Sequence, residues 1–238
     1  MTPEDILTEL IRFRSVVGQP NAAITSWIAD YLGRFGVEAQ ILPGPEGDRA
    51  NLFATIGPHD VPGLVLSGHM DVVPAEEPQW SADPFRLRVE GDRLFGRGTS
   101  DMKGFLAAVL ATVPALAALK PARPIHIAFS YDEEAGCRGV PHLIARLPSL
   151  CAPPAAAVIG EPSGLRPILA HKGKAAARVE IHGRSGHSSR PDLGLNAIHA
   201  MGRVIAAAEE AAMRLRSGPL DPVFEPPYST IQIGTIRG

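Results

Sequence analysis

Four short apolar runs, the last three of which are separated by helical patterns, constrain the fold of this chain more than any other feature of its sequence. Glycine, proline or charged residues bound each run, as they bound buried strands, and the runs read NLFATIG (51–57), GLVLSG (63–68), IHIAFSY (125–131) and AAAVIG (155–160). An alanine-rich helix is predicted over about 104–119 and a shorter helix over 140–146. This alternation predicts an α/β fold with a mostly parallel central sheet flanked by helices.

The segments on either side of this α/β run have their own patterns. Thr2 and Pro3 suit the cap and first position of a helix, and Asn21 suits the cap of a second helix that Gly36 closes. After Gly173 we expect a strand (174–183), a long amphipathic helix (196–216) and another strand (229–238). The chain is therefore predicted to hold a larger domain over 1–173 and part of a small α+β domain over 174–238.

Composition excludes several classes of protein. The 238 residues carry a formal net charge of −2 and are 45% hydrophobic, which is enough to bury a core and leaves no basic surplus for nucleic acid. The longest apolar run contains a proline and is too short to span a bilayer, and the acidic start predicts no signal peptide. Cys137 and Cys151 form no CxxC pair, which favours free thiols in a reducing cytoplasm.

Acidic and imidazole side chains follow three of the four runs and precede the alanine-rich helix. They are His69, Asp71, Asp132, Glu133, Glu134 and Glu161 after the runs, and Asp101 before the helix. In an open α/β sheet, ligands bind outside the carboxyl ends of the strands. Histidine and carboxylates delivered there by separate segments suit a divalent cation such as zinc.

Each of these residues alone has an ordinary explanation. A histidine after a strand is commonly a hydrogen-bonded loop residue, Asp101 is placed as a helix cap would be, and Glu161 before a proline fits a simple turn. Adjacent glutamates in a loop are usually solvated. These explanations do not account for four separate element ends that all carry acid or histidine, and the coincidence favours a metal site.

The chemistry of such a site divides the roles among neighbouring residues. Asp71 can accept the second N–H of the His69 ring and fix its tautomer. The adjacent residues Glu133 and Glu134 have different directions available to them in the turn, so one can bind a metal while the other stays free as a base for amide hydrolysis.

The motif blocks that contain these residues are SGHMDVVP, GRGTSDMKG, YDEE and IGEPS. In this order they resemble the dinuclear zinc amidohydrolases and exopeptidases of the M20 family. The segments AHKGKAAARVEIHGRSGHSSRPDLGLNAI and PPYSTIQIGTIRG extend the resemblance over nearly the whole chain, most closely to the family's N-acetyl amino acid deacetylases.

The resemblance implies a set of metal ligands. His69 and Glu161 would bind one Zn²⁺, Asp101 would bridge two ions, and Glu134 would bind the second; Co²⁺ is a possible substitute. The peptide bond after Asp101 is commonly cis in the family.

It also implies the other roles and the partners. Glu133 would be the general base, Asp71 would support His69, and His187 in the small lid domain would stabilise the oxyanion across a homodimer. The substrate would be a small N-acyl amino acid, foremost N2-acetyl-L-ornithine in arginine biosynthesis, with N-succinyl-diaminopimelate or a dipeptide as alternatives. No nucleic acid or membrane partner is expected.

One departure from the family pattern stands out. Members of the family continue beyond the position of Gly238, and a late histidine completes their second metal site. We therefore expect a C-terminally truncated chain whose second site keeps only Asp101 and Glu134, and whose sheet has an exposed edge. A non-catalytic fragment that binds metal or dimerises is the alternative from another class. A dinucleotide-binding oxidoreductase is disfavoured because the first strand-to-helix turn lacks G-x-G-x-x-G.

Overall fold

The computed structural model describes residues 1–76, 78 and 80–238. The chain divides into two compact units, Met1–Leu165 (unit 1) and Arg166–Gly238 (unit 2). The boundary predicted from the sequence, after Gly173, lies within the first residues of unit 2.

Unit 1 is built on a five-stranded sheet in the order β1-β2-β6-β3-β7. Strands β6, β3 and β7 pair in parallel, whereas β2 is antiparallel to β6 and to β1, so that four of the five strands run in one direction. This confirms the predicted mostly parallel sheet, and all four predicted strands are present. The strands are β1 (Ala39–Pro43), β2 (Ala50–Ile56), β3 (Leu64–His69), β6 (Ile125–Ser130) and β7 (Ala156–Ile159).

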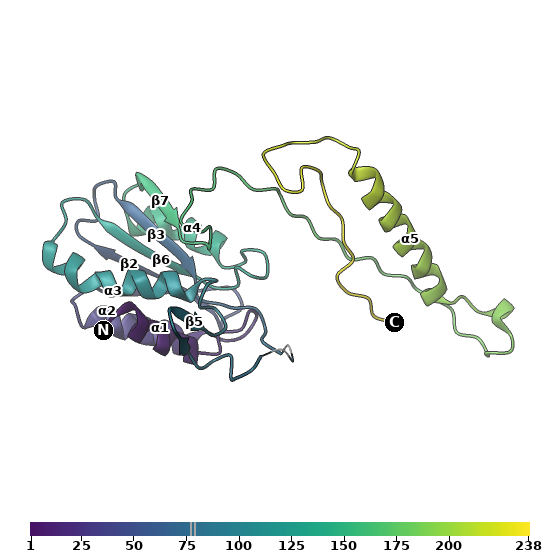
Figure 1. Ribbon diagram of the computed structural model, residues 1–238, viewed down its shortest axis with the longest axis horizontal. Coiled ribbons are helices and arrows are strands. Elements are labelled where there is room, and N and C mark those ends of the chain that lie inside the picture. The colour runs from purple at the N-terminus through teal and green to yellow at the C-terminus, as the bar shows by residue number, and fades with distance from the viewer. Residues whose placement is uncertain (77, 79) are drawn as a thin grey trace. The chain divides into compact units, whose positions relative to one another are not determined.

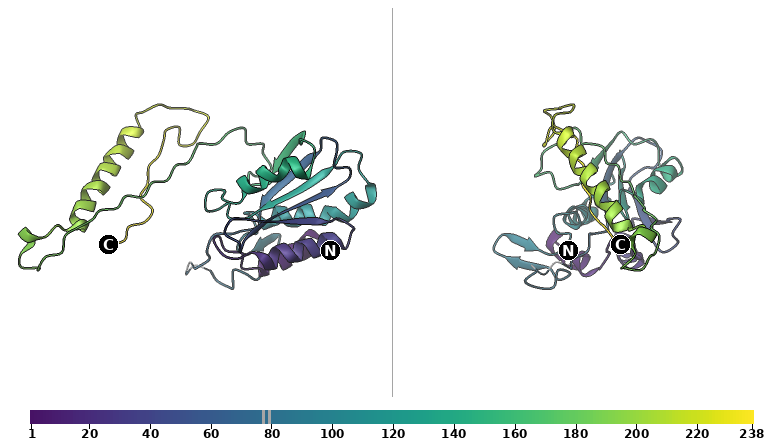
Figure 2. Two further views of the ribbon diagram at one scale, coloured as in Figure 1. Left: turned by 180° about the vertical axis from the view of Figure 1, so that it is seen from behind. Right: turned by 90° about the vertical axis from the view of Figure 1, so that its right-hand side faces the viewer.

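Helices cover both faces of this sheet (Figure 1). Helices α1, α2 and α3 pack on one face, where their apolar side chains form the larger core with alternate residues of β2 and β6, and α4 covers the other face. Figure 2 shows the same layers from behind. A short hairpin of β4 (Arg88–Glu90) and β5 (Arg93–Phe95) stands apart from the main sheet. The helices are α1 (Pro3–Arg12), α2 (Ala22–Gly33), α3 (Lys103–Leu119) and α4 (Val140–Leu150).

The first helix begins where its sequence predicts. The Thr2 hydroxyl accepts the Asp5 N–H, and the Asp5 carboxylate accepts the Thr2 N–H, which satisfies two backbone donors at the helix start. Asn21 does not cap α2 with its side chain as predicted. Its amide instead exchanges two hydrogen bonds with the backbone of Ala50, at 2.8 and 2.9 Å, because this buried side chain faces β2.

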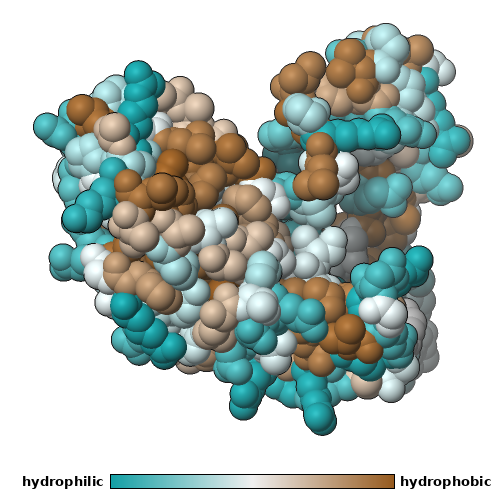
Figure 3. All heavy atoms as spheres, turned by 60° about the vertical axis from the view of Figure 1, so that its left-hand side comes forward, coloured by the Kyte–Doolittle hydropathy of each residue, from teal (hydrophilic) through white to brown (hydrophobic). Residues whose placement is uncertain are grey.

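Strand β7 forms one edge of the sheet, and all four of its residues are exposed. Apolar side chains reach the surface elsewhere as well, and Figure 3 shows hydrophobic patches between hydrophilic ones on the face that it displays. Cys137 and Cys151 are free thiols, as expected. Among the described residues, no helix is both long enough and apolar enough to cross a membrane.

Unit 2 contains one long helix, α5 (Ala197–Leu215), and a short 3-10 helix, η1 (Pro191–Leu193). The helix agrees with the prediction for 196–216. The two predicted strands are absent from 166–238, all of which the structure describes: residues 174–183 and 229–238 form no ladder, and the unit's backbone pairing is an isolated bridge between Arg184 and Leu195. Alternation alone does not make a strand, because a strand also needs a neighbour that pairs its N–H and C=O groups.

Candidate metal centre

Three of the predicted site segments follow strands whose carboxyl ends lie side by side in the sheet. In the parallel register His69, the last residue of β3, is paired with Ser130 at the end of β6, and Ser67 is paired with Ile159 at the end of β7. The residues that follow β6 and β7 therefore emerge beside His69. Proteins with an open α/β sheet bind their ligands just outside these carboxyl ends of the strands.

Close packing helps to bring the end of β7 to the same place. A side chain on Gly160 would overlap the ring of Phe105 on α3, so only glycine lets the backbone approach the helix here. Glu161 follows directly, and its Oε1 lies 3.9 Å from Nε2 of His69.

His69 is the centre of the cluster. Its side chain is buried, and its Nε2 faces carboxylates from three other segments: Oδ1 of Asp101 at 3.0 Å, Oε2 of Glu133 at 3.9 Å and Oε1 of Glu161 at 3.9 Å. Ligand atoms lie within 4.8 Å of one another in two groups, His69–Glu133–Glu161 and His69–Asp101–Glu134. The structure thus gathers all four predicted ligands and the predicted base around one imidazole.

The grouping differs in one detail from the one that the resemblance implies. Glu133, expected to be a free base, lies with His69 and Glu161, whereas Asp101 lies with Glu134. Asp101 still contacts His69 directly, so it remains placed between the two groups.

The environment of His69 sets the tautomer of its ring. Nδ1 lies 2.9 Å from the backbone oxygen of Asp71 and 3.5 Å from its carboxylate, and both oxygens can only accept a hydrogen bond. Nδ1 therefore carries a proton, and neutral His69 presents the lone pair of Nε2 to the carboxylates. That is the tautomer that a metal ligand requires.

The charges around His69 are strongly coupled. Burial works against its charged form, but Asp71, Glu161 and Asp101 outweigh burial and raise the pKa of His69 to about 9. The imidazole is thus protonated near neutral pH in the absence of a metal, and a metal ion would have to displace that proton.

The same crowding of negative charge changes the pKa values of two carboxylates. Burial, and then the negative charge of Asp101, raises the pKa of Glu134. Burial together with Asp101 and Glu133 also raises the pKa of Glu161, against the opposing effect of His69. Carboxylates gathered this closely form a site whose negative charge a divalent cation would neutralise, and one imidazole with carboxylates is a ligand set that zinc accepts.

The ordinary explanation for Asp101 does not hold in the structure. The N-cap of α3 is Met102, and no side chain caps this helix start. Asp101 instead directs its carboxylate at His69. The Asp101–Met102 peptide bond is cis, as the resemblance implied.

Asp71 has a second role beside orienting His69. Its two carboxylate oxygens accept the N–H groups of Glu133 and Glu134, each at 3.1 Å. The buried Asp71 carboxylate thus fixes the turn after β6 to the turn after β3. The carboxylate of Glu133 also accepts a hydrogen bond from the Cys137 thiol, with Sγ 3.3 Å from Oε1.

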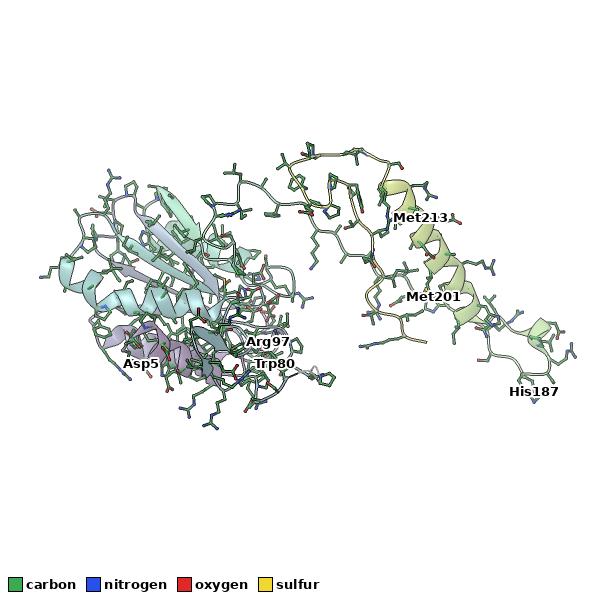
Figure 4. The ribbon with its side chains drawn as sticks, in the orientation of Figure 1. Asp5, Trp80, Arg97, His187, Met201 and Met213 are labelled. Carbon is green, nitrogen blue, oxygen red and sulfur yellow. The ribbon has the colours of Figure 1, made fainter. Side chains whose placement is uncertain are left out.

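His187 lies in unit 2, in the loop ahead of α5, where its exposed side chain projects from the loop (Figure 4). Its Nδ1 accepts the backbone N–H of Ser189 at 3.2 Å and lies 2.8 Å from the Ser189 hydroxyl. A backbone N–H can only donate, so Nδ1 carries the lone pair and neutral His187 has its proton on Nε2. His187 therefore offers an N–H donor to a ligand.

Sequence reasoning missed two cations near the centre. Lys103, two residues after Asp101, is fully buried, and its ammonium donates to the backbone oxygens of Leu10 and Phe13 at 3.0 and 2.8 Å. Burial lowers the pKa of Lys103 to about 7, although Asp71 opposes this effect. Arg49, in the loop before β2, forms an ion pair with Asp132. The motif DMKG contains Lys103, but no local pattern pointed to Arg49.

Comparison with known proteins supports the family resemblance of the chain. The family model described as peptidase family M20/M25/M40 matches residues 65–229, which include every predicted site residue. The chain belongs to this family. It is also 39% identical over 223 residues to an acetylornithine deacetylase of Photorhabdus laumondii, and 38% identical over 221 residues to that of Proteus mirabilis. These alignments cover 93% and 92% of the chain but 57% and 56% of the relatives, so the chain spans little more than half the length of each.

Solved structures show the same fold. A tripeptidase from Staphylococcus aureus matches 94% of the chain with a TM-score of 0.59 at 21% identity, and the chain covers 57% of it. An M20 family metallo-carboxypeptidase from Sulfolobus solfataricus matches 66% of the chain with a TM-score of 0.58 at 23% identity, and the chain covers 37% of it.

Proposed function

We propose that this chain contributes the metal centre of a zinc-dependent amidohydrolase that cleaves N2-acetyl-L-ornithine to L-ornithine and acetate, a step of arginine biosynthesis in the cytoplasm. The observation that carries the proposal is the convergence of His69, Asp101, Glu134 and Glu161 at one sheet edge, with Glu133 beside them. The named relatives support the choice of acetylornithine within the family.

In this proposal His69, Asp101, Glu134 and Glu161 hold zinc, and Co²⁺ is an alternative ion. The donor set fits, because Nδ1 of His69 is held by Asp71, so that Nε2 is the atom that would bind the metal after losing its proton, and Nε2 faces carboxylates that crowd one another. A zinc ion bound there would polarise the substrate carbonyl and make water more acidic.

Glu133 moves the proton. Its carboxylate lies 3.9 Å from Nε2 of His69, beside the proposed ligands, and its backbone N–H is held by Asp71. It would accept a proton from the attacking water as the C–O bond forms and pass that proton to the departing amine nitrogen as the C–N bond breaks. The bond from the Cys137 thiol helps to orient Glu133 for this exchange.

His187 would act from the lid of a second copy of the chain. Its Nε2–H is free to donate to the oxygen on which negative charge develops during attack on the amide. Pairing of two copies through unit 2 is part of the proposal. The large apolar side chains that α5 exposes, Ile198, Ile205 and Met213, support this pairing, since contact with another chain would bury them.

The experiment is a turnover assay on the chain loaded with Zn²⁺ or Co²⁺. We expect N2-acetyl-L-ornithine to be hydrolysed in preference to N-succinyl-diaminopimelate and to dipeptides. Glu133→Gln should abolish turnover while the bound metal is retained, because the amide is close in shape to the carboxylate but cannot accept a proton. Glu38→Gln, which changes an exposed residue of unit 1, is the matched control and should leave turnover unchanged.

Two outcomes would contradict the proposal. Turnover that survives Glu133→Gln removes Glu133 from the role of base. Bound metal without hydrolysis of any of the three substrates would favour a non-catalytic metal-binding chain.

A further inference from the structure

Asp132 is the residue of the turn after β6 that the proposed chemistry does not use, although it immediately precedes Glu133. It is buried, and its backbone has a φ of +50°. The left-handed conformation is unfavourable for most residues, and aspartate is among the few non-glycine types that adopt it. Such a conformation persists where the surrounding structure holds it.

Two segments distant in sequence hold the side chain of Asp132. Its Oδ1 accepts the N–H of Gly18 at 2.7 Å, from the loop after α1. Its Oδ2 pairs with Nη1 of Arg49 at 2.6 Å, from the loop before β2, and the Arg49 side chain is only 13% exposed. The carboxylate is thus fully engaged by a nearly buried cation and a backbone donor.

The conformation of Asp132 sets where the next two residues lie. The chain reverses after β6, and the N–H groups of Glu133 and Glu134 both meet the carboxylate of Asp71. The turn is therefore held at two points, by Arg49 and Gly18 through Asp132 and by Asp71 through the two amides. The side chains of Glu133 and Glu134 leave this turn toward His69.

We infer that the Arg49–Asp132 ion pair positions Glu133 and Glu134 for metal binding and proton transfer. This inference deepens the proposed function and rests on it for the identity of the bound ion. Neither Arg49 nor Asp132 belongs to the two groups of candidate metal ligands, so they are positioning residues. A nearly buried ion pair contributes little net stability compared with apolar side chains of the same volume. A role in fixing the geometry of the turn after β6 therefore explains its presence better than a role in stability.

The loop that carries Arg49 has a second contact that provides a matched control. Glu46, in the same loop, accepts the hydroxyl proton of Tyr131 at 2.8 Å, and Tyr131 is the residue just before Asp132. Glu46→Gln weakens the attachment of the loop without touching the Asp132 carboxylate. Effects that come only from loosening the loop should appear in both the Arg49 and the Glu46 variants.

The test compares Arg49→Met, Arg49→Lys and Glu46→Gln by three measurements. These are amide hydrogen exchange of residues 131–138 in the metal-free protein, Zn²⁺ affinity by chelator competition, and the absorption spectrum of bound Co²⁺. We expect Arg49→Met to speed exchange of the Glu133 and Glu134 amides, to weaken Zn²⁺ binding by up to about 10-fold, less than loss of a group bonded directly to a ligand because Arg49 acts through Asp132, and to change the Co²⁺ spectrum. Arg49→Lys, which keeps the charge, should restore part of the affinity, and Glu46→Gln should leave all three unchanged.

The inference is overturned if Arg49→Met binds Zn²⁺ as tightly as the unmodified chain with an unchanged Co²⁺ spectrum, whatever its loss of stability. It is also overturned if Glu46→Gln has the same effect as Arg49→Met. If Arg49→Met does not fold, Asp132→Asn takes its place, because asparagine also adopts the left-handed conformation and removes the charge alone. None of these readouts requires turnover, so absence of amide hydrolysis would count against the proposed activity and leave the positioning test intact.

Discussion

Units 1 and 2 differ in how they bury their apolar side chains. Unit 1 buries side chains from α1, α2, α3, β2 and β6 in one continuous core. None of residues 166–238, all of which the structure describes, is buried, and α5 exposes apolar side chains along its length. Burial of apolar area is the main source of folding free energy. Unit 1 therefore has a core that stabilises its fold, whereas unit 2 buries too little apolar area to gain much stability from this source.

This difference matters for function because the candidate site residues are divided unequally between the units. His69, Asp101, Glu133, Glu134 and Glu161 are attached to the ends of core elements in unit 1. Only His187 belongs to unit 2. Groups that must hold a metal within a few tenths of an ångström benefit from a rigid support, and the core elements of unit 1 provide one.

The largest expected effect comes from opening a cavity in the unit 1 core. Ile127→Ala, at a fully buried position of β6, should lower the free energy of unfolding of unit 1 by about 2–5 kcal/mol. Ile205→Ala on α5, where the side chain is 38% exposed, should leave it unchanged. Urea unfolding followed by tryptophan fluorescence reports unit 1 selectively, since Trp27 and Trp80 both lie there. An equal loss in the two variants would show that the units unfold together.

The second prediction compares the contributions of the two units to metal binding. His69→Ala removes the residue shared by both ligand groups and should weaken Zn²⁺ affinity by more than about 100-fold, beyond the effect of losing an outer-shell partner. His187→Ala should leave the affinity as it is and lower only turnover. Chelator competition and activity assays on both variants provide the measurements. Weaker Zn²⁺ binding in His187→Ala would mean that unit 2 takes part in holding the metal.

The elements of unit 1 were predictable because their signals are local. An apolar run bounded by breakers specifies β3 and β6 without knowledge of their neighbours, and the strand-end argument then brought His69, Glu134 and Glu161 to one edge. Strand β1 was missed because it is partly polar and ends in a proline. The strands expected in unit 2 were wrong because pairing is a property of two segments and not of one.

The part of the site that escaped prediction is also non-local. Arg49 and Asp132 are 83 positions apart, and neither stands in a pattern that indicates the other. The oxygen that accepts the His69 ring proton at 2.9 Å belongs to the backbone of Asp71, which frees the carboxylate for the turn after β6. Spacing in a sequence identifies residue types suited to metal binding, but the partners that orient them depend on the folded chain.

A third, smaller effect is a pH dependence of stability confined to unit 1. His126 on β6 is fully buried, with Nδ1 2.9 Å from the Thr55 hydroxyl, and Nε2 has no hydrogen-bond partner among the described residues. Burial, and then the nearby His59, lowers the pKa of His126 in the folded state. The unfolded chain therefore binds more protons, so the stabilising contribution is present above the usual histidine pKa of about 6.5 and is lost as the pH falls through the folded-state pKa.

The measurement is urea unfolding of unit 1 between pH 5 and pH 8. Binding of one proton changes the free energy of unfolding by at most about 1.4 kcal/mol per pH unit. His126→Gln should flatten the acid side of the profile, whereas His142→Gln, at an exposed position of α4, should not. An unchanged profile in His126→Gln would assign the acid sensitivity to other groups.

The smallest effect is expected in unit 2, at the residue that holds His187. Ser189→Ala removes the hydroxyl 2.8 Å from Nδ1 of His187 but keeps the backbone N–H, so the ring should lose part of its orientation. A net hydrogen-bond contribution of about 0.5–1.5 kcal/mol corresponds to a two- to tenfold lower kcat with KM nearly unchanged, since the Nε2–H acts on charge that develops during the reaction. Ser188→Ala, one position away, is the control.

Long-range ¹H–¹⁵N correlation of the His187 ring checks the geometry without turnover, because an Nδ1 that accepts the Ser189 N–H must give the signal of an unprotonated nitrogen at a pH where the ring is neutral. A protonated Nδ1 in the neutral ring would exclude this arrangement.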